Sequence, residues 1–115
     1  MKIAIHAFDD MTMFHLAAPL LVFETAADLG LAPEWETTVW TPGSGSIRTV
    51  ERLVLDDLAG AEAAEAADLL VFPSWPTELP PPTDEMVDLV QRAHRRGAQI
   101  AGLCLGAFPV AGSGV

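Results

Sequence analysis

The sequence is poor in cysteine, in basic residues and in long apolar segments. It has 115 residues, one cysteine and no tyrosine. A single cysteine excludes an intramolecular disulfide, and a lone thiol is typical of the reducing cytoplasm, where we expect this protein. Six basic residues against sixteen acidic ones give a net charge of −10. Such a charge repels phosphate backbones, so we expect no nucleic-acid binding by this chain alone.

No segment has the composition of a signal peptide or a membrane span. The apolar run at the N-terminus ends after a few residues at Asp9, which is too short for a signal-peptide core. The most apolar helical stretch, 14–23, contains His15 and Pro19 and falls well below the roughly 18 residues that a bilayer requires. The sequence therefore predicts a soluble protein with no membrane partner.

Apolar residues make up half of the chain, enough for one core and one domain. The apolar run at 68–72 is typical of a strand buried on both faces of a parallel sheet, and 98–103 is expected to be the next buried strand. We also expect strands over 2–7 and 36–41, a hairpin region over 47–55, and helices over 14–29, over 61–67 and from Thr83 or Asp84 to Gly97. This order predicts an α/β fold, a three-layer sandwich around a mainly parallel, flavodoxin-like sheet, with sites at the carboxyl ends of the strands.

Other polar and apolar patterns have structural interpretations. The helix at 14–29 is apolar nearly all round, which predicts burial in the core or against a partner chain and is compatible with a homodimer. The pairs Asp9-Asp10 and Asp56-Asp57 are expected in loops, because neighbours on a strand would point apart. His6 is expected to be a core residue with its hydrogen bonds satisfied.

The segment Gly102-Leu103-Cys104-Leu105-Gly106 follows a predicted strand and precedes a helical segment. A side chain at the top of such a turn forces its backbone into a strained region, and the flanking glycines remove Cβ atoms that would collide. The helix start favours a thiolate at Cys104 and lets Leu105 donate to an oxyanion. We therefore expect Cys104 in a nucleophile-elbow turn at the end of a central strand; the alternative is a small buried structural cysteine.

Two further regions are predicted to meet this turn. We expect the loop after the neighbouring buried strand to direct the backbone N–H groups of Ser74 and Trp75 toward the same point. The Trp75 ring is expected to pack in the structure, with a wall of a small pocket as the alternative. His15 is a candidate base for Cys104, which would make a Cys–His nucleophile pair. The alternative for His15 is a histidine packed in the first helix and hydrogen-bonded locally.

Three segments resemble the ThiJ/PfpI branch of the class I glutamine amidotransferase-like superfamily, in particular the amino-terminal domains of AraC-type transcription regulators. They are FDDMTMFHLAAPLLVF at 8–23, DLLVFPSW at 68–75 and AQIAGLCLGAFPVA at 98–111, and the likeness extends over essentially the whole chain. The resemblance implies an elbow at Cys104 with backbone donors from Leu105, Ser74 and Trp75. His15 and Leu21 stand where enzymatic relatives often have carboxylates, which weakens the case for their catalysis.

These observations favour a ligand-sensing or oligomerising domain of a transcription regulator that lacks its DNA-binding part, rather than an enzyme. The alternatives are a cysteine-dependent hydratase or amidohydrolase using Cys104, and a fragment with no activity of its own. We expect a small-molecule ligand and neither a cofactor nor a metal. Domains of the resembled family run to about 180 residues, so residues 1–115 are expected to form one ThiJ/PfpI-like domain that is incomplete at its C-terminus.

Overall fold

Four parallel strands form the central sheet, in the order β2-β1-β5-β6. The computed structural model describes all residues from 1 to 115. The strands are β1 (Lys2–His6), β2 (Glu36–Trp40), β5 (Leu69–Phe72) and β6 (Gln99–Gly102), and a separate antiparallel hairpin consists of β3 (Gly45–Arg48) and β4 (Val54–Leu58). The mainly parallel sheet predicted from the sequence is confirmed.

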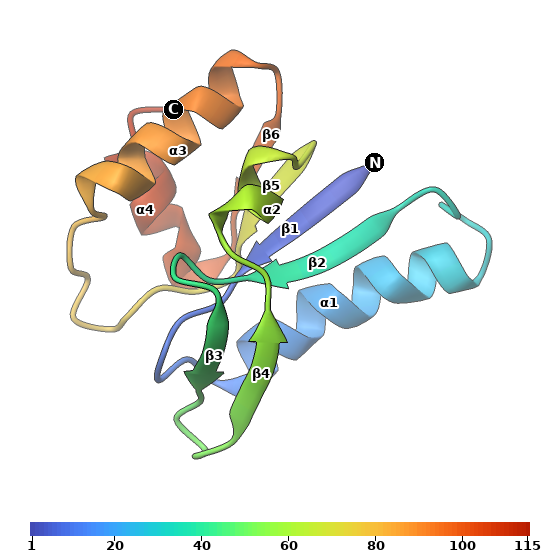
Figure 1. Ribbon diagram of the computed structural model, residues 1–115, viewed down its shortest axis with the longest axis horizontal. Coiled ribbons are helices and arrows are strands. Elements are labelled where there is room, and N and C mark those ends of the chain that lie inside the picture. The colour runs from blue at the N-terminus through green and yellow to red at the C-terminus, as the bar shows by residue number, and fades with distance from the viewer.

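Helices cover the sheet in two layers (Figure 1). One face packs against α1 (Met13–Asp28) and the hairpin, and the other packs against α2 (Ala61–Glu65), α3 (Asp84–Arg95) and α4 (Ala107–Gly112). A short 3-10 turn, η1 (Cys104–Gly106), joins β6 to α4. The three-layer sandwich is therefore present, and none of its helices is long and apolar enough to cross a membrane.

Strand alternation divides the core between these two faces. Ile3 and Ile5 of β1 belong to the cluster on the α1 side, whereas Ala4 between them belongs to the cluster with α2 and α3. All three are at most 1% exposed. The strand β1 is therefore buried on both faces, as is typical of a strand inside a parallel sheet.

The helix α3 begins and ends as its sequence predicts. The Thr83 side chain accepts a hydrogen bond from the backbone N–H of Met86, which caps the helix start. Acidic residues occupy the first turn and basic ones the last, as the helix dipole favours. Gly97 ends the helix with φ 96°, a left-handed conformation that favours glycine.

Two expectations about placement were wrong, and one alternative for helix α1 is excluded. Helix α1 is not buried in the core of this chain: only Leu16 and Pro19 are buried, and Phe14 and Leu21 are largely exposed. The other alternative, packing against a partner chain, stays a prediction. The strand β6 is at the edge of the sheet and not at its centre. Asp56 and Asp57 lie within β4, because the hairpin register shifts there and Asp57 takes φ 57° with its N–H donating to the Asp56 carboxylate.

His6 lies in the core, but its hydrogen bonds are not satisfied as expected. The imidazole is 3% exposed and packs among aromatic rings, with Trp40 and Phe72 at centroid distances of 5.2 Å and Phe8 at 5.8 Å. Its Nδ1 has no hydrogen-bond partner. Burial lowers the pKa of His6 from its ordinary 6.5 to about 4, because the charged form is poorly solvated there.

We predict that His6 makes the protein less stable in acid. The folded state holds the neutral imidazole, so the unfolded chain takes up the proton first as the pH falls from 6.5 toward 4. The free energy of unfolding should drop by about 3 kcal/mol over that range and then stop responding to this group. Urea unfolding of the parent and of His6→Phe, which retains an aromatic ring without the titration, measures this loss.

Acidic side chains titrate in both proteins, so the difference between them isolates His6. Parallel losses of stability in the parent and in His6→Phe would contradict the prediction.

Candidate functional site

The loops that follow β1, β5 and β6 meet at the carboxyl edge of the sheet. The strand β1 has β2 on one side and β5 on the other, so the direction of the strand order reverses at β1. Ligand sites in open α/β sheets lie in the crevice at such a reversal, at the carboxyl ends of the strands. A cavity of about 560 Å³ lies there. The sequence-predicted residues that line it are Cys104, His15, Leu105, Ser74 and Trp75.

Cys104 has the backbone strain predicted for it. Its φ is 54°, in the left-handed region that a non-glycine residue rarely occupies, and it directly follows the loop residue Leu103 at the end of β6. The turn is held by main-chain hydrogen bonds: the Leu103 N–H donates to the Phe72 carbonyl at 2.9 Å, and the Gly106 N–H donates to the Leu103 carbonyl at 2.8 Å. Cys104 itself is exposed, so it is not the small buried cysteine of the structural alternative.

Both glycines of the turn are needed because other main-chain atoms occupy the space of a side chain. A Cβ on Gly106 would lie 1.9 Å from the Phe72 carbonyl oxygen, and one on Gly102 would lie 2.6 Å from the Gly106 carbonyl oxygen. These distances are far below van der Waals contact, and a backbone atom cannot rotate away. The turn therefore depends on glycine at both positions.

His15 makes the local hydrogen bond that was the alternative to a Cys–His pair. Its Nδ1 is paired with the Thr12 hydroxyl, and its backbone N–H donates to the same oxygen, which caps α1. No hydrogen bond joins His15 to Cys104, although both line the cavity. The geometry thus brings the two side chains to one cavity without pairing them.

Ser74 and Trp75 lie at the end of β5 with free backbone donors. Both residues are buried, and neither donates its backbone N–H to another residue of the chain. The indole N–H of Trp75 donates to the Pro80 carbonyl at 2.8 Å, which holds the proline-rich loop against the ring. Both residues also line the cavity, so these two N–H groups are candidate donors to a bound molecule.

The rest of the lining was not singled out from the sequence as part of a site. It adds carboxylates, hydroxyls and apolar groups, from Phe8, Asp9, Asp10, Met11, Thr12, Val50, Pro76, Thr77 and Glu78. Most of these follow β1 or β5, so their position after a buried strand was the signal that could have identified them. The Asp9 carboxylate accepts a hydrogen bond from the Arg48 N–H at 2.9 Å, which connects the loop after β1 to the end of β3. No group of three or more His, Cys, Asp or Glu residues could hold a metal ion.

Solved structures with the same fold include transcription regulators. A candidate transcriptional regulator from Vibrio parahaemolyticus superposes with a TM-score of 0.84 at 19% identity, covering 100% of this chain and 62% of its own. An AraC family transcriptional regulator from Pseudomonas putida gives 0.81 at 22%, covering 98% and 60%. A DJ-1 superfamily protein from Agrobacterium tumefaciens gives 0.74 at 23%, covering 99% and 58%.

These likenesses establish the fold, and the chain spans about 60% of the length of each of these proteins. No protein-family model and no curated protein matches the sequence. The resemblance to ThiJ/PfpI proteins is confirmed at the level of the fold, which this chain shares with DJ-1/ThiJ/PfpI-like proteins and with AraC-family regulators.

We predict that Gly106→Ala destabilises the protein by at least about 3 kcal/mol, and valine at this position by more, because the new Cβ meets the Phe72 carbonyl. The matched control is Gly43→Ala, since a Cβ on Gly43 meets nothing within 4 Å. The control should change the free energy of unfolding by less than about 1 kcal/mol. Urea unfolding measures both, and equal stabilities of the two variants would refute the close contact.

Proposed function

We propose that this chain is a ligand-sensing ThiJ/PfpI-like domain of a transcription regulator, and that it binds a small molecule in the cavity beside Cys104. The observation that carries the proposal is the free backbone N–H groups of Ser74 and Trp75 at a cavity that Cys104 and Leu105 also line. Donors of this kind suit a carbonyl oxygen of a ligand, whereas the carboxylates of Asp9, Asp10 and Glu78 in the same lining disfavour an anion.

The size and lining of the cavity support a small ligand. About 560 Å³ lies within the range of pockets that bind metabolite-sized molecules. Aromatic side chains of Phe8 and Trp75 line the cavity together with hydroxyls of Thr12 and Thr77. Such a mixture can hold an apolar body while fixing its polar groups.

The regulatory part of the proposal derives from the fold comparison. An AraC family transcriptional regulator and a candidate transcriptional regulator share the fold over nearly all of this chain. Each of those chains extends beyond the matched part, which covers 62% and 60% of its length. In this proposal the present chain supplies the part that responds to the ligand.

A cysteine-dependent hydratase or amidohydrolase is the second candidate, favoured by the strained, exposed Cys104. Such an enzyme needs a base that takes the thiol proton. His15 shares the cavity but is paired with the Thr12 hydroxyl and has no hydrogen bond to Cys104. This arrangement favours a binding role for the pocket.

We predict that Cys104 reacts with iodoacetamide at a rate that His15→Ala changes by less than about twofold at neutral pH, since no hydrogen bond joins the two side chains. A catalytic pair would instead slow at least about tenfold on losing its base. The reaction is followed by mass spectrometry, because the chain has one thiol. His94→Ala, a change at an exposed histidine outside the cavity, is the matched control, and a tenfold loss confined to His15→Ala would favour the enzyme.

We also predict that small uncharged amides and other carbonyl compounds of metabolite size include at least one that raises the melting temperature and slows iodoacetamide labelling of Cys104. Trp75→Ala should abolish both effects, because it removes one wall of the cavity. Trp35→Ala, a change at a tryptophan that packs against Phe23 away from the cavity, should leave them in place. A stabilising compound that still binds Trp75→Ala and leaves the thiol unprotected would place its site elsewhere and contradict the proposal.

A further inference from the structure

The walls of the cavity beside Cys104 are fastened to the rest of the molecule to very different degrees. One wall consists of the loop after β1 and the tip of the hairpin, which are joined by four hydrogen bonds. These bonds run from the N–H groups of Asp10, Arg48, Val50 and Met13 to the Arg48 carbonyl, the Asp9 carboxylate, the Met11 carbonyl and the Glu51 carboxylate, at 2.8, 2.9, 3.0 and 3.1 Å respectively. This wall is therefore firmly held.

A second wall is the segment 76–80 in the loop after β5, of which residues 76–78 line the cavity. The segment takes part in only two hydrogen bonds. One closes a turn within the segment at 2.9 Å, and the other is the bond from the Trp75 indole N–H to the Pro80 carbonyl at 2.8 Å. This wall lies at the carboxyl edge of the sheet, whereas Val115 lies at the other edge, in a groove with the first residues of β5 and β6.

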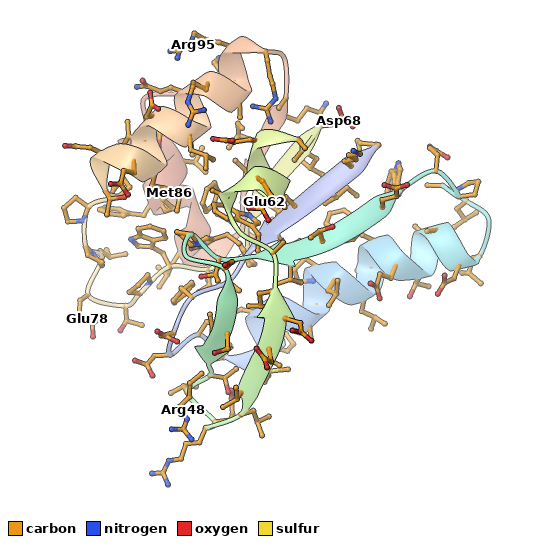
Figure 2. The ribbon with its side chains drawn as sticks, viewed as in Figure 1. Arg48, Glu62, Asp68, Glu78, Met86 and Arg95 are labelled. Atoms are coloured by element: carbon orange, nitrogen blue, oxygen red, sulfur yellow. The ribbon has the colours of Figure 1, made fainter.

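The side chains of the segment 76–80 add little to its attachment. Residues 77–80 are exposed, and Glu78 lies on the outside of the loop between β5 and α3 (Figure 2). Leu79 is 39% exposed and takes φ 53°, a left-handed conformation that is strained for a residue with a side chain. Few hydrogen bonds, exposed side chains and backbone strain are the features of segments that open locally while the rest of a protein stays folded.

The residue that fastens this segment is itself fixed in place. Trp75 is 8% exposed, and its ring packs beside His6 at a centroid distance of 5.9 Å and beside Phe8 at 6.4 Å. The donor of the bond to Pro80 is therefore held by the core, while the acceptor lies on the exposed loop. Breaking this one bond frees the segment without disturbing the aromatic cluster.

The residues that follow the segment limit how far it moves. Pro80, Pro81 and Pro82 are consecutive, and a run of prolines forms a stiff extended chain. Thr83 comes directly after them and caps α3, with its hydroxyl accepting from the Met86 N–H at 3.2 Å. The far end of the segment is therefore anchored through a short rigid connection, so any opening is confined to a few residues beside the cavity.

We propose that residues 76–80 are a lid over the cavity, that the Trp75 indole is its latch, and that an occupant of the cavity holds the lid closed. The lid opens when the bond from Trp75 to Pro80 breaks, which lets a molecule enter. The backbone N–H groups of Ser74 and Trp75 and the lid residues 76–78 then surround that molecule. The last step, the effect of an occupant, rests on the ligand-binding function proposed above, whereas the lid and its latch do not.

Digestion of the parent with a protease that cleaves after glutamate tests whether the lid opens by itself. Cleavage after Glu78 should not change in urea concentrations well below those that unfold the protein, since opening of the lid exposes little new surface. Cleavage after Glu36 in β2 requires global unfolding and should rise steeply. Mass spectrometry gives both rates, and a peptide substrate corrects for the effect of urea on the protease. A parallel rise at both sites would show that residues 76–80 open only with the whole protein and would overturn the proposal.

Trp75→Phe tests the latch, because it keeps an aromatic ring and removes the N–H. Loss of one hydrogen bond should increase the open population and speed cleavage after Glu78 at least about fivefold. Trp35→Phe, at a tryptophan that packs against Phe23 away from the cavity, is the matched control and should change the rate by less than about twofold. Cleavage after Glu36 in the same digests reports any loss of global stability. Equal cleavage after Glu78 in the two variants would refute a latch at Trp75.

Alkylation of Cys104 with iodoacetamide tests the effect of an occupant. The reagent leaves an uncharged amide on a residue of the cavity lining, where its carbonyl can accept from the N–H groups of Ser74 and Trp75. The alkylated protein should be cleaved after Glu78 at least about threefold more slowly than the untreated protein, and Cys104→Ser exposed to the same reagent should show no change. Unchanged cleavage of the alkylated protein would contradict closure by an occupant. A ligand screen without a stabilising compound would instead count against the proposed function, since the latch is measured without any ligand.

Discussion

The contact between the Phe72 carbonyl group and the turn after β6 holds the carboxyl edge of the sheet together around Cys104. That oxygen accepts the Leu103 N–H at 2.9 Å and lies where a Cβ of Gly106 would be. One carbonyl thus contacts both sides of the turn that contains Cys104, whose φ is 54°. Ser74 and Trp75 follow Phe72 after one residue, Pro73, so the same part of β5 lies next to the turn and leads into the cavity lining.

Beneath the cavity lies an aromatic cluster that connects the site to the core. His6 is surrounded by Phe8, Trp40, Phe72 and Trp75, and two of these rings also line the cavity. The floor of the site is therefore made of the same side chains that fill the interior. A neutral imidazole suits this apolar setting, and its protonation would place a charge directly under the cavity.

The sequence predicts most of the fold because the strongest signals are local. Apolar runs located β5 and β6, Thr83 located the start of α3, and the spacing of glycines around Cys104 located the strained turn. The exposure of α1, the edge position of β6 and the bulged placement of Asp57 depend on which elements pack together, and periodicity within one segment does not contain that information. The same limit applies to the site. The sequence predicts that His15 and Cys104 lie near each other, but it does not predict which group His15 bonds, because the hydrogen bond to Thr12 depends on side-chain geometry.

The steric requirement for glycine at 102 and 106 determines which residues of such chains can be compared to detect a change of function. Their side-chain positions are filled by main-chain atoms, so selection for folding alone retains them whether or not the cysteine between them has any chemistry. A lineage that loses catalysis would keep Gly102 and Gly106 and be free to change the residues around the pocket. Conservation of the two glycines among related chains is therefore evidence for the fold of the turn and not for catalysis. Differences at pocket residues such as His15 and Trp75 are the ones that would indicate a change of ligand or activity.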